Sequence, residues 1–193
     1  MKIFALTLAM LVMLTGPALA VVPLDAAAIR AAQDYGRSKA NVPLAEFLQP
    51  WTVYEERAAR FDDTAERACH YSPFLLVAAD ARDRTTAGGP VIAADAAKVL
   101  ADYEGYVVFG VTLFGVQADA GGRLAASLRQ GRRTIGASLV NALPPGDAGP
   151  ANLVQVYFYF PARDVAADKE ALLTVTTADK RTRNFRVPFG GQR

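Results

Sequence analysis

The residue types that most often perform enzymatic chemistry are scarce in this sequence. The chain contains one histidine, His70, and one cysteine, Cys69, and the two are adjacent. Neighbouring side chains point about 100° apart on a helix and to opposite faces of a strand, so these two are not expected to pair. A lone thiol without a partner base is a weak candidate nucleophile and cannot form an intramolecular disulfide. We interpret Cys69 as a buried structural residue beside an exposed or capping histidine.

Other catalytic and ligand-binding motifs are incomplete. Ser138 lies in Gly-Ala-Ser-Leu-Val, which lacks the closing glycine of a hydrolase nucleophile elbow. Residues 131–138 have the glycine spacing of a phosphate-binding loop, but Ala137 stands where that loop needs lysine. Acidic clusters at residues 62–66 and 80–83 offer oxygen ligands, and we interpret them as helix-capping and solvated charge. The sequence therefore predicts no metal, no cofactor and no nucleic-acid partner, and it favours a non-catalytic protein over an enzyme.

Basic side chains gather at two predicted hairpin turns in the second half of the chain. If both turns lie at one end of a sheet, they form a positive patch for an anionic envelope polymer or another protein. The acidic first part of the same chain is a further candidate partner, and solvated charge that protects sheet edges is the alternative. The residues of this candidate patch are Arg129, Arg132, Arg133, Lys180, Arg181, Arg183 and Arg186.

An aromatic strand, Tyr157-Phe158-Tyr159-Phe160, provides the second candidate binding surface. Alternation along a strand places Phe158 and Phe160 on the core face and Tyr157 and Tyr159 on the opposite face. The two tyrosines could form an exposed stacking surface for a sugar or a protein partner. The alternative is that a helix covers them, because large exposed aromatic patches are uncommon in monomers.

Charge is distributed unevenly along a chain whose net charge is only +2. Residues 21–120 carry more acidic than basic side chains, and residues 121–193 carry more basic than acidic ones. We therefore expect either a contact between an acidic and a basic region or two separate charged surfaces.

The first twenty residues have the features of a secretory signal peptide. Lys2 precedes an apolar run over residues 3–14, and Ala18-Leu19-Ala20 matches a small-residue cleavage site. The apolar run is shorter than a membrane-spanning helix needs, and Val21 stands where a lipoprotein would carry cysteine. We expect cleavage near Ala20 and export from a bacterial cytoplasm to the periplasm, cell surface or extracellular space. An uncleaved anchor is the alternative, and no transmembrane span is expected in the mature chain.

Helix-capping residues mark the helical segments of the mature chain. Asp25 is an N-cap candidate, and Asp63 with Glu66 forms the pattern of a capping box. Helices are expected over residues 26–37, 44–48, 64–71 and 93–103.

Strand patterns dominate after Pro73. The run from residue 106 to residue 116 is apolar on both faces, as a central strand covered on both sides requires. Turn residues, including Gly131, separate the shorter segments. Extended segments are expected over residues 51–56, 74–78, 106–116, 123–128, 134–140, 153–160, 172–177 and 182–189.

These elements predict an α+β, mainly β fold. The specific expectation is an immunoglobulin-like antiparallel β-sandwich of about seven strands with N-terminal helices packed on it. The expected organisation is a signal peptide over residues 1–20, a helical and extended segment over 21–72 and a sandwich over 73–193. Residues 21–193 are expected to form a single compact unit.

Fold class alone does not give function. We expect an exported, non-catalytic binding or structural module of the cell envelope or extracellular space. It would act through the basic turns or through Tyr157 and Tyr159. The alternative is a cell-envelope hydrolase whose carboxylates, including Asp80 or Glu55, converge only in three dimensions, and buried acids in a cleft would favour it.

Overall fold

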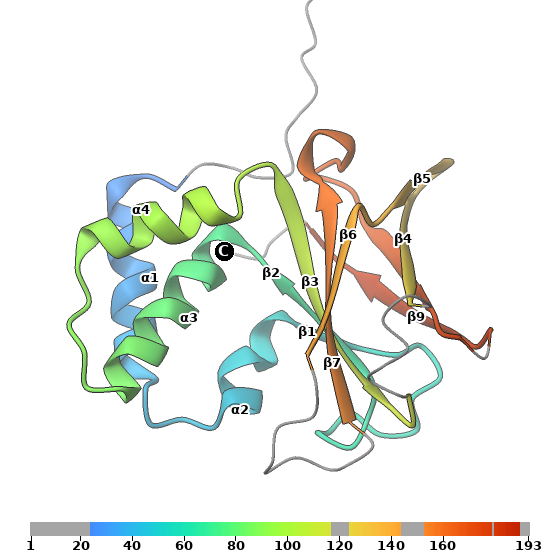
Figure 1. Ribbon diagram of the computed structural model, residues 1–193, viewed down its shortest axis with the longest axis horizontal. Helices are drawn as coiled ribbons and strands as arrows, with labels where there is room; N and C mark the ends of the chain where they lie inside the picture. Colours follow the sequence, from blue (N-terminus) through green and yellow to red (C-terminus); the bar gives the residue numbers. More distant parts are fainter. Residues whose placement is uncertain (1–23, 117–123, 144–152, 179, 190–193) are drawn as a thin grey trace, which may run out of the picture.

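The computed structural model describes residues 24–116, 124–143, 153–178 and 180–189, which form an α+β, mainly β structure (Figure 1). The predicted signal peptide lies outside these residues. The four helices within them are α1 (Ala26–Ser38), α2 (Leu44–Leu48), α3 (Pro73–Thr86) and α4 (Ala93–Asp102). The nine strands are β1 (Thr52–Tyr54), β2 (Arg67–Tyr71), β3 (Tyr106–Phe114), β4 (Ala125–Gln130), β5 (Arg133–Gly136), β6 (Leu139–Leu143), β7 (Leu153–Pro161), β8 (Ala171–Thr176) and β9 (Thr182–Val187).

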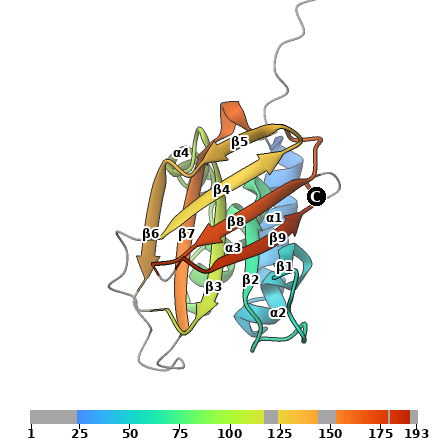
Figure 2. The same cartoon turned by 90° about the vertical axis from the view of Figure 1, so that its right-hand side faces the viewer.

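The strands form two antiparallel sheets that face each other. The strand order is β1-β2-β3-β7-β6 in the five-stranded sheet and β5-β4-β8-β9 in the four-stranded sheet. The helices lie together on the outer face of the five-stranded sheet (Figure 1), and the four-stranded sheet lies on its other side (Figure 2). The five-stranded sheet is therefore covered on both faces, which explains why its central strands β3 and β7 are largely apolar.

Alternation along the strands separates two apolar cores. The core between the two sheets contains Phe109, Phe158 and Phe185, whose side chains are fully buried. The core between the helices and the five-stranded sheet contains Phe47 and Trp51. Each face of the five-stranded sheet thus contributes to a different core.

Helices α1 and α3 are in backbone contact at Gly36. A Cβ atom at this position would come within 2.1 Å of the Ala78 carbonyl oxygen. Only glycine allows the two helices to approach this closely, so Gly36 determines how the helical layer packs.

The predicted strand over residues 74–78 is wrong, because these residues belong to α3. Ser72 is the N-cap of this helix, and its hydroxyl accepts a hydrogen bond from the Leu75 N–H at 3.3 Å. Pro73 occupies the first helical position, where its fixed φ favours the helix. A run of five apolar residues resembles a buried strand, but the serine and proline before it start a helix.

The predicted helix over residues 64–71 is also wrong, because Arg67–Tyr71 forms β2. Glu66 does not complete a capping box. Its carboxylate accepts hydrogen bonds from the Phe114 N–H and from Arg183. β2 pairs with β1 on one side and β3 on the other, so long-range strand pairing outweighs the local helical pattern.

The strand count among the described residues is nine rather than about seven. The predicted segment over 51–56 contains β1, the segment over 134–140 is divided between β5 and β6, and β2 was not predicted. An immunoglobulin-like topology is not confirmed. The helices at α1, α2 and α4, the central strand β3 and the final hairpin of β8 and β9 are confirmed. Within the described ranges, no helix is long and apolar enough to cross a membrane.

The two sheets are connected on both sides of the sandwich. On one side, Glu55 and Phe185 form an isolated antiparallel bridge between the end of β1 and β9. On the other side, the chain itself passes from β5 to β6. The Ala137 N–H donates a hydrogen bond to the Ala126 carbonyl of β4 at 2.9 Å, and the next N–H, that of Ser138, donates to the Tyr159 carbonyl of β7 at 2.8 Å. These contacts fix the sheets relative to each other at both edges.

Candidate functional site

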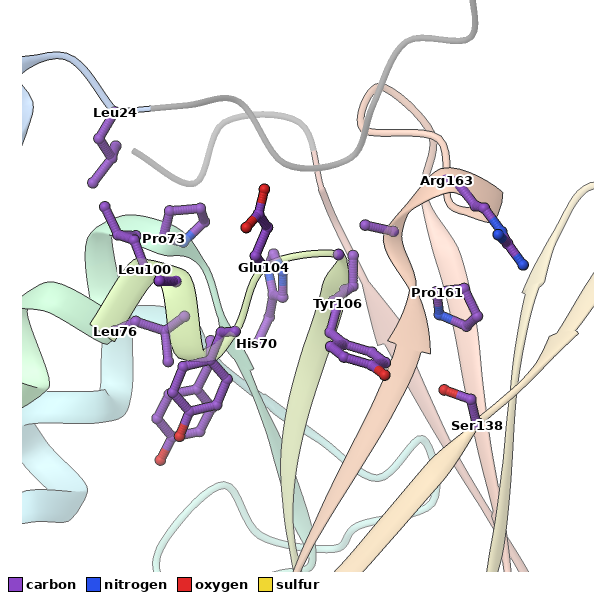
Figure 3. A pocket seen from close by; sticks show the side chains of 16 residues that line it. Leu24, His70, Pro73, Leu76, Leu100, Glu104, Tyr106, Ser138, Pro161 and Arg163 are labelled. Carbon is purple, nitrogen blue, oxygen red and sulfur yellow. The ribbon is translucent and has the colours of Figure 1, made fainter. Parts of the chain in front are cut away.

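A cavity of about 930 Å³ opens between the helices and one end of the five-stranded sheet (Figure 3). Residues of α3 and α4 form one wall, and the ends of β2, β3 and β7 form the other. We call it the tyrosine cavity because Tyr71, Tyr103 and Tyr106 line it. Its apolar lining includes Leu24, Pro73, Leu76, Leu100, Val107 and Pro161.

The aromatic wall of the cavity belongs to a larger tyrosine cluster on the helix-facing side of the sheet. The rings of Tyr103 and Tyr159 are stacked, with centroids 6.3 Å apart and an interplanar angle of 8°. Tyr106 meets Tyr159 edge to face at 5.8 Å, and Tyr71 packs against Tyr157 at 5.8 Å. Aromatic contacts of this kind add stability beyond the area that they bury, so the rings have defined positions.

Gly110 makes room for two of these rings. A Cβ atom at Gly110 would come within 2.8 Å of Tyr71 Cε2 and 3.2 Å of Tyr157 Cε1. The Tyr71 and Tyr157 hydroxyls are hydrogen bonded to each other, and Gln155 Nε2 donates to the Tyr157 hydroxyl at 3.0 Å. A glycine in the middle of β3 therefore allows Tyr71 to lie flat against the sheet at the edge of the cavity.

Burial raises the pKa of three phenol groups in this cluster. Desolvation raises the pKa of Tyr71, Tyr157 and Tyr159 above the ordinary value of 10. These three phenols therefore stay uncharged and able to donate hydrogen bonds to a higher pH than an exposed tyrosine does.

Two charged side chains, those of Glu104 and Arg163, line the cavity from exposed positions. Glu104 is exposed, and its side chain stands between Pro73 and Tyr106 (Figure 3). Within the part of the chain that the structure describes, no side-chain hydrogen bond or ion pair engages the Glu104 carboxylate. Arg163 points away from Tyr106, has a side chain that is 84% exposed and lies 3.9 Å from a carboxylate oxygen of Asp164.

Cys69 and His70 point to opposite sides of β2, as strand geometry requires. Cys69 faces the helices, and burial raises the pKa of its thiol to about 12. His70 faces the other way, and its ring packs against Phe109 at 5.2 Å and Phe189 at 4.9 Å. The histidine is therefore buried rather than exposed or capping, although it also lines the tyrosine cavity.

The two tyrosines named from the sequence lie on the helix-facing side of β7, opposite the core face. Tyr157 is half-buried against Tyr71, and Tyr159 is half-buried between Tyr103 and Tyr106. Neither tyrosine forms an exposed stacking surface by itself. Tyr159 instead supports two rings that line the cavity.

The two basic turns lie at opposite ends of the four-stranded sheet (Figure 2). Arg129 on β4 pairs with Leu172 near the start of β8, whereas Thr176 at the end of β8 pairs with Thr182. The turn with Arg129, Arg132 and Arg133 is therefore separated by the length of β8 from the turn with Lys180 and Arg181. The basic residues do not form one continuous patch.

Several of the basic side chains already have acidic partners. Arg183 is only 4% exposed and pairs with Glu66. Arg133 pairs with Asp164, and Arg186 pairs with Glu56 and Glu170. Binding of an anionic polymer or a protein by either turn stays a prediction.

Asp80 and Glu55, the two carboxylates named for a hydrolase, do not share a site. Asp80 accepts a hydrogen bond from Arg84 Nε at 2.8 Å on the surface of α3. Glu55 accepts one from the Arg57 N–H at 2.6 Å and lines, with Glu66, a separate pocket of about 330 Å³. Among the described residues, no three His, Cys, Asp or Glu side chains are grouped so that they could hold a metal ion.

Sequence reasoning identified Tyr159 but missed the residues that line the cavity. Tyr71, Tyr103, Glu104 and Tyr106 come from β2, β3 and the connection after α4, and only the fold brings them together. The available signal was Tyr103-Glu104-Gly105-Tyr106, in which two aromatic residues and an acid surround the turn between a helix and a strand.

Comparisons with known proteins provide no family assignment. No protein-family model, curated protein or solved structure matches the chain significantly. The functional argument therefore depends on the geometry of the tyrosine cavity.

Proposed function

We propose that this protein is an exported, non-catalytic binding module that holds a small organic molecule in the tyrosine cavity. The observation that carries the proposal is the cavity itself, about 930 Å³ in volume and lined by apolar side chains and three tyrosines. Ligand sites in proteins commonly measure about 300–1,000 Å³ and combine an apolar lining with a few polar groups.

The arrangement of the polar groups supports binding rather than catalysis. A nucleophile needs a base within hydrogen-bonding reach. The Ser138 hydroxyl donates instead to the Tyr159 carbonyl at 3.1 Å, and the Cys69 thiol is buried with a raised pKa. A hydrolase of the glycosidase type would need two acids on one ligand, whereas among the described residues Glu104 contributes the one carboxylate that lines the cavity.

Export rests on the sequence of the first twenty residues. Lys2, the apolar run and Ala18-Leu19-Ala20 together support cleavage near Ala20. The proposed location is the cell envelope or the extracellular space. Expression in a bacterium, followed by cell fractionation and N-terminal sequencing, tests this part of the proposal. A product in the cytoplasm that retains Met1 would contradict it.

Filling the cavity tests the binding function. Ala101 is exposed on α4 and lines the cavity, so Ala101→Trp places an indole in it without removing a buried side chain. Ala94 is exposed on the same helix and does not line the cavity, so Ala94→Trp is the matched control. We expect the neutral fluorescent probe N-phenylnaphthylamine to bind the purified protein and the control. Its affinity should fall by at least about tenfold in Ala101→Trp, because one bulky group excludes another.

Two results would count against a binding cavity. Equal affinity for the probe in Ala101→Trp and Ala94→Trp would show that the probe binds elsewhere. Hydrolysis of an ester or glycoside substrate by the protein, abolished by Glu104→Gln, would favour the hydrolase instead.

A further inference from the structure

We propose that the tyrosine cavity recognises an organic cation, namely a substituted ammonium group attached to an apolar body. This inference rests on the proposed function and specifies its ligand class. It depends on two independent observations, the tyrosine rings that line the cavity and the acidic group at its opening.

The aromatic rings provide the first part of the argument. The face of an aromatic ring carries partial negative charge, and it attracts a cation within about 6 Å of the ring centroid. Tyr71, Tyr103 and Tyr106 line the same cavity although they come from β2, from the connection after α4 and from β3. Contacts with Tyr157 and Tyr159 fix these rings before a ligand arrives.

The charge at the opening provides the second part. Glu104 is the only carboxylate among the lining residues, and no basic side chain in the described ranges is paired with it. Arg163, the one arginine among the described residues that line the cavity, points away from Tyr106 toward solvent and lies near Asp164 (Figure 3). The Glu104 carboxylate therefore attracts a cation toward the rings and repels an anion.

The lining also limits the kind of cation. A bare metal ion needs several oxygen or nitrogen ligands, and no three His, Cys, Asp or Glu side chains of the described residues are grouped so that they could hold one. A substituted ammonium group needs no such ligand set, because its methyl or methylene groups contact aromatic and aliphatic surface directly. Leu76 and Leu100 provide that aliphatic surface deeper in the cavity.

A pair of isosteric ligands tests this inference. Choline carries a trimethylammonium group, and its neutral carbon isostere carries a tert-butyl group of the same shape. Both are titrated against the purified protein in competition with N-phenylnaphthylamine. We expect choline to bind at least about tenfold more tightly than its isostere, which corresponds to a cation–π contribution of ordinary strength.

Two cavity variants and one control assign the preference to the named residues. Glu104→Gln and Tyr106→Leu should each bring the ratio of the two affinities toward one. Glu46→Gln makes the same charge change on the exposed surface of α2, far from the lining residues, and should leave the ratio unchanged. Thermal unfolding followed by circular dichroism verifies that each variant is folded.

The outcomes separate the two proposals. If the probe binds in the cavity but choline and its isostere bind equally, the cation inference is overturned and the binding function stands. An unchanged ratio in both Glu104→Gln and Tyr106→Leu overturns it as well. If Ala101→Trp does not weaken probe binding, the cavity is not a binding site and both proposals fail.

Discussion

Arg183 and Glu66 form an ion pair across the two sheets. Arg183 Nε lies 3.1 Å and 3.0 Å from the two carboxylate oxygens of Glu66, and its side chain is only 5% exposed. Arg183 Nη1 also donates to the Thr177 hydroxyl, and Glu66 accepts from the Phe114 N–H. The acidic first part of the chain and its basic second part therefore meet inside the molecule at this point.

The two halves of this ion pair should differ in their contribution to stability. Glu66→Gln leaves the buried Arg183 charge uncompensated, and we expect the free energy of unfolding to fall by about 2 kcal/mol. Arg183→Met should cost less, because Glu66 is 20% exposed and keeps its hydrogen bond from Phe114. Urea denaturation of both variants measures the difference. A larger loss in Arg183→Met than in Glu66→Gln would contradict this account.

Gly110 should not tolerate even a methyl group. In Gly110→Ala the new Cβ would overlap Tyr71 and Tyr157, and we expect the free energy of unfolding to fall by about 1–3 kcal/mol. Gly136→Ala on β5 is the matched control, because no atom lies within 4 Å of its added Cβ. Urea denaturation should show the control unchanged within about 0.5 kcal/mol. Equal stability of the two variants would show that the rings move freely.

The Cys69 thiol should be unreactive in the folded protein. A thiol with a pKa of about 12 is ionised to about one part in ten thousand at pH 8, and this side chain is only 6% exposed. We expect iodoacetamide to label Cys69 completely in concentrated guanidinium and very slowly without it. Mass spectrometry over time measures both rates. Labelling of the native protein as fast as that of the denatured protein would disprove the prediction.

Stability should decline at alkaline pH because of the tyrosine cluster. A tyrosine whose pKa is raised in the folded state stabilises the fold below its ordinary pKa near 10, and this contribution is lost as pH rises above that value. Burial raises the pKa of Tyr71, Tyr157 and Tyr159 in this way. The urea midpoint should therefore fall between about pH 9.5 and 11, together with the appearance of tyrosinate absorbance. Tyr71→Phe should show a shallower fall, and an unchanged slope would argue against the cluster as its cause.

Elements with a local start signal were the most predictable from the sequence. Asp25 caps α1 as expected, and its carboxylate accepts a hydrogen bond from the Ala28 N–H at 2.7 Å. The same logic applied to Ser72 and Pro73 would have identified α3, but the apolar run after them outweighed the cap in the prediction. Arg67–Tyr71 could not be assigned locally, because only pairing with β1 and β3 makes it a strand.

The candidate site was predictable only in part. Strand alternation placed Tyr157 and Tyr159 away from the core face, and the structure agrees. The cavity beside them depends on how α4 ends against the sheet, which no pattern in one segment encodes. The positions of the two basic turns depend on how the strands pair in the four-stranded sheet. Local sequence patterns do not give that pairing, so they cannot tell whether both turns lie at the same end of the sheet.

The bridge between Glu55 and Phe185 has a consequence for the order of folding. Nearby, Glu56 and Arg186 form a hydrogen-bonded ion pair between residues 130 positions apart in the chain. Closing such a large loop is entropically unfavourable, and contacts of this separation slow folding. A growing chain that has not yet reached Thr182 cannot form β9, so the sandwich remains open along that edge until residues 182–187 have been made. The edge of the sandwich formed by β1 and β9 is therefore the last to close.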